Sequence, residues 1–405
     1  MSSLFRRVAV TGSVLALSAA ALAGCGSSGS KDDNSPSGSG SGATAKSACN
    51  LTSPPTSGAS APASGGATGK ASGKVGVILP DTTSSTRYTL YDKPLLTSAL
   101  KAAGITPDVQ NAQGDKNKFA SIAQNMIGEG VKVLIIDSID AASGAGVEKA
   151  AAAAGVKVID YDRVNLGGTA GYYVSFDNED VGKLQAQTLV DCLNADGVKK
   201  PKIIMMDGGT DVDNNAVLFK KGAHEVLDPL VSAGKATIEE EAVVKGWNVA
   251  NAAPAFSSAL TAAGGKVDGV VAANDDIANA VIGVLKQQGL DGHVVITGQD
   301  SGVEGLQNIV NGQQSMTVFK NVKLEAQAAA QLAIALIAGK DPSSAGLTLA
   351  PFTDPQSATH NLQALLLPAQ VITQANVQDV VTAGALTTAD ICKGITDACG
   401  KLGLS

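Results

Sequence analysis

The stretch Val156-Lys-Val-Ile-Asp-Tyr-Asp-Arg-Val-Asn165 passes within a few residues from an apolar, β-branched run to a cluster of charges. Its residues up to Ile159 are typical of a buried strand in a parallel sheet. Asp162 and Arg163 follow just past the carboxyl end of that strand, the edge at which open α/β sheets bind ligands. A carboxylate that accepts hydrogen bonds beside a guanidinium that donates them favours one polar ligand held from two sides. A solvated turn at the strand end would carry the same dipeptide, so the rest of the chain has to decide between the two interpretations.

Apolar strands alternate with helical spacing over most of the chain. Strands are expected at 74–79, 108–111, 131–136, 156–159, 201–206, 237–244, 267–273, 294–297 and 315–319, and helices at 87–103, 119–127, 142–154, 177–195, 215–230 and 324–337. This alternation predicts βαβ units on parallel sheets, and its restart at residue 201 predicts two doubly wound α/β lobes. Beyond residue 337 we expect only short strands and loops, with strands at 362–367 and 371–373.

Polar side chains follow the ends of the expected strands in both halves of the chain. They are Asp81, Arg87, Asp137, Asp162, Arg163, Asp213, Asn214, Asn215, Trp247, Asn274, Asp300 and Lys320. If the carboxyl edges of the two sheets face each other, these side chains line one cleft, and ligand sites favour such interfaces.

The residue types in this set argue against catalysis, a metal and a cofactor. The three histidines, His224, His293 and His360, are scattered and lie outside the set, so we expect no metal site. The chain has neither a Gly-x-Ser-x-Gly motif nor a Gly-x-Gly-x-x-Gly motif after a strand. The carboxylates alternate with Arg, Lys and Asn, and nearby cations lower the pKa of an aspartate. Such carboxylates suit the acceptance of hydrogen bonds more than proton transfer.

A sugar needs this mixture of donors and acceptors, because each hydroxyl both donates and accepts a hydrogen bond. The C–H faces of a sugar ring also pack on aromatic side chains. Aromatic residues make up only 3% of the chain, and Tyr88 and the single tryptophan, Trp247, each lie beside polar strand-end residues. The two rings could hold a sugar from opposite lobes. The alternative for Trp247 is a structural role, in which it packs a helix onto the sheet.

The N-terminal residues have the pattern of an export signal. Arg6 and Arg7 precede an apolar run over 8–23, and Leu22-Ala23-Gly24-Cys25 resembles a bacterial lipobox. We therefore expect a signal peptide over 1–24 and a lipid on Cys25, rather than a membrane-spanning helix. An ordinary secretory signal with a chance cysteine is the alternative.

Loss of the signal peptide would remove two of the 30 basic residues and none of the 37 acidic ones, which leaves a net charge of -9. So acidic an exported chain is a poor candidate for nucleic acid, and a lipid rather than a basic patch would hold it at the membrane. Residues 25–73 are rich in Gly, Ser, Ala, Pro and Thr and have almost no large aliphatic side chains. This composition predicts a flexible tether that does not dock and that sugar binding does not need.

The four remaining cysteines are Cys49, Cys192, Cys392 and Cys399, which allow three sets of pairings. Cys392 and Cys399 are close in sequence, so a disulfide between them is the preferred pairing. Cys192 follows a helical run and fits a buried free thiol, and its pairing with Cys49 stays open.

Several motifs together resemble those of the periplasmic sugar-binding proteins of the ribose and xylose type, most of all the xylose-binding ones. The resemblance covers about Lys74 to Gly384. The motifs are Thr86-Arg87-Tyr88, Tyr161-Asp162-Arg163, Val174-Ser-Phe-Asp-Asn178, Val212-Asp-Asn-Asn-Ala216, Gly246-Trp247, Ala273-Asn274-Asp275, Gly298-Gln-Asp300 and Met316-Thr-Val-Phe-Lys320.

This resemblance implies a type I periplasmic-binding-protein fold, with two lobes joined by a multi-strand hinge. It implies sugar contacts from Arg87, Asp162, Arg163, Asn214 or Asn215, Asn274, Asp300 and Lys320, and stacking by Tyr88 and Trp247. The lobes are expected at 74–178 with 321–353 and at 179–320 with 354–398, with chain crossings near Asn178, Lys320 and Thr353. The same fold occurs in lactose-repressor-like regulators, but the export signal and the lack of an N-terminal helix-turn-helix argue against that class.

The expected function is therefore that of a monomeric, lipid-anchored solute-binding protein of an ABC-type importer. Its expected ligand is a monosaccharide, with D-xylose as first choice, and its expected partner is the membrane permease. Binding is expected to proceed by hinge closure, for which periplasmic binding proteins are the general example. Two other functions remain open, a sugar-sensing lipoprotein that acts on a signalling partner and an exported carbohydrate-active enzyme.

Overall fold

The computed structural model describes residues 46–49, 51, 72–357 and 359–404. The expected signal peptide, the lipidation site Cys25 and most of the expected tether therefore lie outside the described residues. None of the helices within the described ranges is long and apolar enough to cross a membrane.

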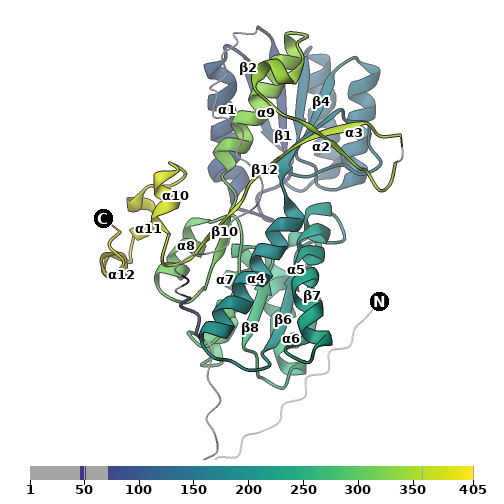
Figure 1. The fold of residues 1–405 in the computed structure, drawn as a ribbon. Coiled ribbons are helices and arrows are strands. Elements are labelled where there is room, and N and C mark those ends of the chain that lie inside the picture. Colours follow the sequence, from purple (N-terminus) through teal and green to yellow (C-terminus); the bar gives the residue numbers. More distant parts are fainter. Residues whose placement is uncertain (1–45, 50, 52–71, 358, 405) are drawn as a thin grey trace, which may run out of the picture. The chain divides into compact units, whose positions relative to one another are not determined.

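A sheet of seven strands, in the order β11-β12-β5-β4-β3-β1-β2, forms the centre of the first lobe (Figure 1). All neighbouring strands are parallel except β11 and β12. The strands are β1 (Lys74–Leu79), β2 (Thr106–Asn111), β3 (Val133–Ile136), β4 (Lys157–Tyr161), β5 (Tyr172–Phe176), β11 (Ala350–Phe352) and β12 (Leu362–Leu367).

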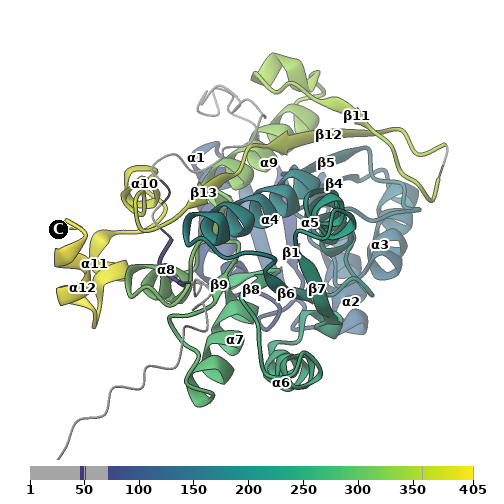
Figure 2. The same cartoon turned by 60° about the horizontal axis from the view of Figure 1, so that its bottom comes forward.

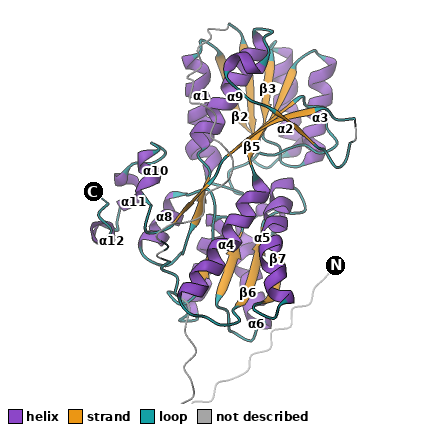
Figure 3. Ribbon diagram, in the orientation of Figure 1, coloured by secondary structure: helices purple, strands orange, loops and turns teal. Residues whose placement is uncertain are grey.

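Helices cover both faces of this sheet, as its doubly buried strands require. The first face carries α1 (Lys93–Ala102), which follows the short helix η1 (Tyr88–Asp92), and α9 (Val322–Ile337). The second face carries α2 (Lys116–Gly128) and α3 (Ala141–Ala153). Figure 3 shows the strands of each lobe between their helices.

The second lobe has a sheet of four parallel strands in the order β7-β6-β8-β9. Helices α4 and α5 pack together on one side and α6 and α7 on the other (Figure 2). The elements are β6 (Lys202–Asp207), β7 (Thr237–Val243), β8 (Gly269–Ala272), β9 (Val295–Ile296), α4 (Asn178–Ala195), α5 (Asn214–Ser232), α6 (Ala252–Ala262), α7 (Asp275–Gln287) and α8 (Val303–Val310), with the short helices η2 (Lys245–Trp247) and η3 (Val249–Asn251). The predicted fold class, two doubly wound α/β lobes with parallel sheets, is confirmed.

Two glycines allow α4 and α5 to approach each other closely. A Cβ atom on Gly182 would lie 2.0 Å from the carbonyl oxygen of Phe219, and one on Gly222 would lie 2.0 Å from that of Glu179. Any side chain at either position would therefore push the helices apart. This contact holds the first half of α5 against α4, and that half supplies Asn215 and Phe219 to the pocket described below.

The third crossing between the lobes was predicted at the wrong place. The strand β12 pairs in parallel with β5 and so belongs to the first lobe, whereas β13 (Gln370–Ile372) pairs with β10 (Thr317–Phe319) beside the second. The chain crosses from the first lobe to the second between β12 and β13, after Leu367. We expected this crossing near Thr353, between the segments 321–353 and 354–398. A local pattern shows where a strand lies but not which strand it pairs with, which explains the error.

The C-terminal segment contains helices as well as the expected short strands. They are η4 (Pro342–Ala345), α10 (Gln378–Thr382), α11 (Thr388–Cys392) and α12 (Thr396–Lys401). A disulfide joins Cys392 to Cys399, and both side chains pack in an apolar cluster with Leu306 and Ile309 of α8. The cluster explains how such short helices hold their place, since isolated helices of this length are not stable in water.

Part of the expected tether docks on the second lobe. A disulfide joins Cys49 to Cys192 of α4, so the interpretation of Cys192 as a free thiol was wrong. The backbone N–H of Ser47 donates to the carbonyl oxygen of Gly292 at 3.2 Å, and its hydroxyl donates to that of Val294 at 2.6 Å. Both Ser47 and Cys49 are buried. We expected no docking because the tether has no apolar pattern. The disulfide and these two hydrogen bonds nevertheless hold this part of it on the lobe.

Replacing Cys49 and Cys192 by serine is expected to lower the free energy of unfolding by roughly 2–4 kcal/mol. Replacing Cys392 and Cys399 should cost less, because a disulfide that closes a longer loop restricts the unfolded chain more. The two disulfides span 143 and 7 residues. Calorimetric melting of both double variants without reductant measures the difference, and a wild-type melting temperature for the first variant would contradict the expectation.

Candidate ligand-binding site

A small polar pocket lies where strands of both lobes end. It is lined by Ser84, Ser85, Arg87, Tyr88, Asp162, Arg163, Asp213, Asn215, Phe219, Trp247, Asn274, Gln299, Asp300 and Lys320. The structure thus brings together all the residues expected to bind the ligand except Asn214. Asn214 and Asn215 are the first two residues of α5, and adjacent helical residues point in different directions. Only Asn215 faces the pocket, where its amide contacts the backbone of the first lobe.

Asp162 has a left-handed backbone conformation, with φ of +59°, directly after β4. Its carbonyl oxygen accepts hydrogen bonds from the Ser175 hydroxyl at 2.7 Å, the Asn215 amide at 2.9 Å and the Tyr173 hydroxyl at 3.0 Å. Aspartate and asparagine tolerate this conformation better than most residues. The turn therefore holds the Asp162 carboxylate in the pocket, with its backbone fixed by both lobes.

Arg87 is the buried cation to which the Asp162 carboxylate is bound. Its Nη1 donates to Oδ1 of Asp162 at 2.8 Å. Its Nε and Nη2 bind both carboxylate oxygens of Asp92, at 3.0 and 2.8 Å, and Nη2 also donates to Glu325 at 2.6 Å. A guanidinium with two of its edges held by carboxylates loses little freedom when it binds a ligand. Arg87 is therefore positioned before a ligand arrives.

Arg163 contacts groups of both lobes. Its guanidinium donates to the carbonyl oxygen of Ser138 at 3.1 Å and to the Ser84 hydroxyl at 3.3 Å. Its Nε lies 3.4 Å from Oδ2 of Asp213 in the second lobe and 3.8 Å from Oδ1 of Asp137 in the first. Arg163 is thus a cation shared by an acid from each lobe.

The second lobe presents its polar groups through helix N-caps. Asp213 caps α5 by accepting from the backbone N–H of Asn215 at 2.8 Å, and Asn274 caps α7 by accepting from that of Ile277 at 2.9 Å. In a βα unit the cap follows the strand end, so residues that favour capping collect at the ligand edge. The Asn274 amide also donates to the carbonyl oxygen of Ser84 at 3.4 Å, which brings the first lobe to the same edge.

Trp247 lines the pocket and is also part of the packing of the second lobe. Its indole Nε1 donates to Oδ2 of Asp213 at 3.0 Å, and its ring meets that of Phe219 edge-on, with centroids 6.3 Å apart. A Cβ on Gly208 would lie 2.1 Å from the indole, so the ring packs directly on this glycine. The binding and structural interpretations of Trp247 therefore do not exclude each other.

Lys320 and Asp300 form an ion pair at one side of the pocket. The Lys320 Nζ lies 3.2 Å from Oδ1 of Asp300 and 3.7 Å from Oδ1 of Asp162. The Ser85 hydroxyl of the first lobe donates to Oδ2 of Asp300 at 3.2 Å. Lys320 and Asp162 are buried, whereas the Asp300 side chain is 11% exposed.

Three acidic and three basic side chains line the pocket, and the pKa values of the buried aspartates in and beside it differ with their surroundings. Burial alone would raise the pKa of Asp162, but Arg87, Lys320 and Arg163 outweigh burial and lower it. Burial raises the pKa of Asp137 and of Asp213 despite the nearby Arg163. The expectation that cations lower the pKa of the site's aspartates therefore holds for Asp162 and fails for the other two.

Sequence reasoning missed the two acidic residues behind Arg87. Asp92 and Glu325 hold Arg87 from outside the pocket, and both are fully buried. The available signal was Glu325 itself, an acid on the apolar helix α9, where a buried charge requires a partner. Among the residues that line the pocket, Ser84, Ser85, Phe219 and Gln299 were missed as well, whereas Asp213 belonged to the strand-end set.

No three His, Cys, Asp or Glu side chains are grouped to hold a metal ion within residues 46–49, 51, 72–357 and 359–404. The pocket instead offers fixed donors and acceptors of both signs, with Tyr88, Phe219 and Trp247 as aromatic surfaces. Such an array suits a small polyhydroxylated ligand with an apolar face.

The fold and the pocket together define a two-lobed ligand-binding protein. A family model described as a periplasmic binding protein domain matches residues 75–341. The chain belongs to this family, as a periplasmic sugar-binding protein of the ribose and xylose type.

Curated relatives include the D-xylose-binding periplasmic proteins of Escherichia coli and Haemophilus influenzae. The first is 40% identical over 253 residues, which are 62% of this chain and 75% of the relative. The second is 36% identical over 290 residues, which are 72% of this chain and 83% of the relative. Among solved structures, a carbohydrate transporter solute-binding protein from Chloroflexus aurantiacus in complex with D-glucose is similar, with a TM-score of 0.71 and 29% identity. The match covers 79% of this chain and 98% of that one.

The Glu325→Gln variant is expected to lose part of the pH dependence of folding stability. Burial raises the pKa of Glu325 from its ordinary value of 4.5 to about 8, although Arg87 opposes the rise. Between these values the folded state holds a proton that the unfolded state has released, so stability falls as the pH rises, by up to about 1.4 kcal/mol per pH unit. Glutamine does not titrate and should remove this slope. Chemical denaturation of both proteins from pH 5 to pH 9 tests it, and parallel curves would contradict the assignment.

Proposed function

We propose that the protein is the extracytoplasmic solute-binding component of an ABC-type sugar importer and that its first-choice ligand is D-xylose. The observation that carries the proposal is the buried set of Arg87, Asp162, Arg163, Asn274 and Lys320 around one small pocket. Each sugar hydroxyl can donate to a carboxylate or amide oxygen and accept from a guanidinium, ammonium or amide group there. The D-xylose-binding relatives support the choice of ligand.

Hinge closure is the proposed mechanism. Three chain segments join the lobes, and Arg163, Asn215 and Ser85 each contact the opposite lobe at the pocket. A ligand that contacts both lobes binds best to the conformation in which they approach, and it shifts the population toward that conformation. The permease would recognise that conformation. A lipid on Cys25 would keep the protein at the membrane, and this anchor is part of the proposal.

Isothermal titration calorimetry against a panel of pentoses and hexoses tests the ligand. The expected result is saturable 1:1 binding of D-xylose that is tighter than binding of D-glucose, the sugar in the similar Chloroflexus aurantiacus structure. If glucose binds more tightly than xylose, glucose becomes the proposed ligand, and the proposed class of function is unchanged. Absence of binding by every sugar in the panel would overturn the function.

A sensory role is the second candidate. A curated relative from Rhizobium radiobacter, 32% identical over 79% of this chain, is described as a multiple sugar-binding periplasmic receptor. Uptake of labelled sugar by cells with and without the gene separates the two functions. Uptake that does not depend on the gene would favour sensing.

A further inference from the structure

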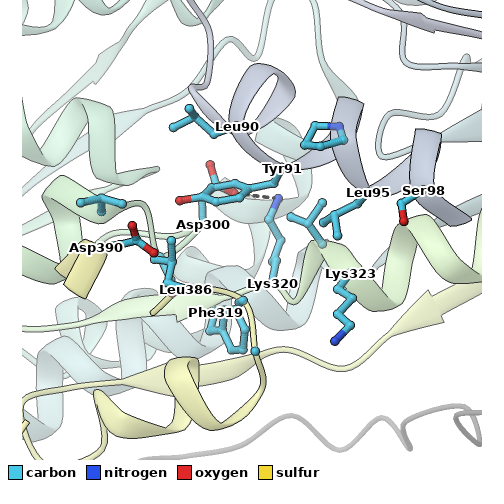
Figure 4. Close-up of a pocket in the computed structure, with 16 residues that line it drawn as sticks. Leu90, Tyr91, Leu95, Ser98, Asp300, Phe319, Lys320, Lys323, Leu386 and Asp390 are labelled. Carbon is cyan, nitrogen blue, oxygen red and sulfur yellow. Dashed lines mark ion pairs between the residues drawn. The ribbon is translucent and has the colours of Figure 1, made fainter. Parts of the chain in front are cut away.

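A second, larger cavity of about 560 Å³, drawn in Figure 4, shares lining residues with the candidate sugar site. Its walls come from the start of α1, the junction of β10 and α9, and residues 384–390 of the C-terminal segment. The cavity has a volume typical of sites for small organic ligands, which measure roughly 300–1,000 Å³.

The two cavities share a wall. Asp300 and Lys320 line both of them, and Figure 4 shows their ion pair at the edge of the larger cavity. Asp300 is the most exposed of the paired charged side chains in the sugar site, at 11%, whereas those of Arg87, Asp162 and Lys320 are 2–6% exposed. The side of the sugar site that is least closed is therefore the side that faces the larger cavity.

The larger cavity differs in chemistry from the sugar site. Its lining is mainly apolar, with Leu90, Leu95, Phe319 and Leu386 among the side chains, and it also includes the charged residues Lys323 and Asp390. Leu90 is 54% exposed. The Tyr91 hydroxyl is buried and has no hydrogen-bond partner among the described residues. Burial raises the pKa of Tyr91 to about 12, so the phenol stays protonated and can donate a hydrogen bond. The cavity thus suits a largely apolar group that carries an acceptor for the Tyr91 hydroxyl.

We infer that the larger cavity binds the aglycone of a glycoside whose sugar ring occupies the candidate sugar site, and that an aromatic aglycone fits it best. This inference rests on the proposed sugar-binding function and extends it from free monosaccharides to aryl glycosides. The substituent would leave the sugar at the oxygen closest to Asp300, pass the Asp300–Lys320 pair, and pack against Leu90, Tyr91 and Leu386.

One wall of the cavity lies outside the part of the chain that the family model matches, which ends at residue 341. Residues 384–390 form this wall, and the Cys392–Cys399 disulfide and the apolar cluster around α8 hold it in place. Because this wall is fixed in place and lies next to the sugar site, we expect it to influence which ligands the protein binds.

Calorimetry with matched ligands tests the inference. The ligands are D-xylose, methyl D-xyloside and phenyl D-xyloside, with both anomers of each glycoside. The phenyl glycoside of the better anomer should bind at least about tenfold more tightly than its methyl counterpart, because burial of a benzene ring is worth about that much. If the panel identifies another sugar, the methyl and phenyl glycosides of that sugar replace those of xylose.

Two variants and one control test whether the gain in affinity from the phenyl group arises in the larger cavity. Ser98 is an exposed residue of α1 that lines the cavity, so Ser98→Trp should fill it and remove the phenyl advantage while free sugar binds as before. The matched control is Ser121→Trp, at an exposed position of α2 that lines neither cavity, which should retain the advantage. Leu386→Ser should reduce the advantage by removing an apolar contact without filling the cavity.

The outcomes separate the inference from the function. If free sugar binds and its phenyl and methyl glycosides bind equally, or if Ser98→Trp keeps the full phenyl advantage, the aglycone site is rejected and the proposed function stands. If no free sugar binds, both are rejected.

Discussion

Asp162→Asn is expected to weaken sugar binding by at least about tenfold. The Asp162 carboxylate binds Arg87 at 2.8 Å, lies 3.7 Å from Lys320, and lines the pocket, so its charge serves both cations and the ligand. An asparagine amide supplies one acceptor in place of two and leaves the cations without their shared anion. Asparagine also accepts the φ of +59°, which alanine would adopt only with strain, so the variant tests charge rather than backbone conformation.

Asp160→Asn is the matched control for this experiment. Asp160 lies on β4, two residues before Asp162, and is fully buried, but it binds Asn165 and lies near Glu148 of α3 instead of the pocket cations. Calorimetric titration should show wild-type affinity for Asp160→Asn. Unchanged affinity in Asp162→Asn, or an equal loss in both variants, would show that the Asp162 carboxylate does not bind the ligand.

Arg163→Ala should reduce affinity by a similar factor and should also lower stability. The guanidinium lies between Asp137 and Asp213, and neither oxygen of Asp137 has another hydrogen-bond partner among the described residues. Its removal leaves two buried acids without their cation, at a cost of about 3–5 kcal/mol for a broken buried pair. Thermal melting without sugar, measured with the titration, separates the two effects.

The site was predictable because two local rules place its residues at one edge. Strand runs such as 156–159 show where strands end, and the capping residues Asp213 and Asn274 mark where the next helices begin. Since parallel strands end at the same edge, strand ends far apart in sequence come together without any knowledge of strand order. The sequence could therefore predict the pocket residues even though it misplaced one crossing between the lobes.

The features that were missed depend on partners far away in the sequence. Glu325 binds Arg87 across 238 residues, Cys49 bonds to Cys192 across 143, and β12 adds to the first sheet only because β5 offers a free edge. Each local pattern is compatible with several partners, and tertiary packing selects among them. The wall over residues 384–390 was missed for the same reason, since its short helices gain their stability from contact with α8.

Trp247→Ala is expected to lower both the affinity for sugar and the melting temperature of the sugar-free protein. If the indole packs on the apolar face of the sugar, its removal should cost roughly 1–3 kcal/mol of binding energy, or about 5- to 150-fold in Kd. The same ring packs on Gly208 and against Phe219 and donates to Asp213, so stability should fall as well. Trp247→Phe should recover part of both losses, because it restores a ring but not the indole N–H.

Leu227→Ala provides the control for an indirect effect of lower stability. Leu227 is fully buried on α5 and does not line the pocket, and its truncation should cost about 2–5 kcal/mol of stability. If Leu227→Ala lowers the melting temperature as much as Trp247→Ala but binds sugar normally, the lost affinity of Trp247→Ala reflects a direct contact. Because Trp247 is the only tryptophan, its emission should also change with sugar and saturate at the calorimetric Kd. The binding role of Trp247 is rejected if its emission does not change when sugar is added and if Trp247→Ala binds sugar with wild-type affinity. Trp247 would then have only a packing role, and Tyr88 would be the main aromatic surface for the ligand.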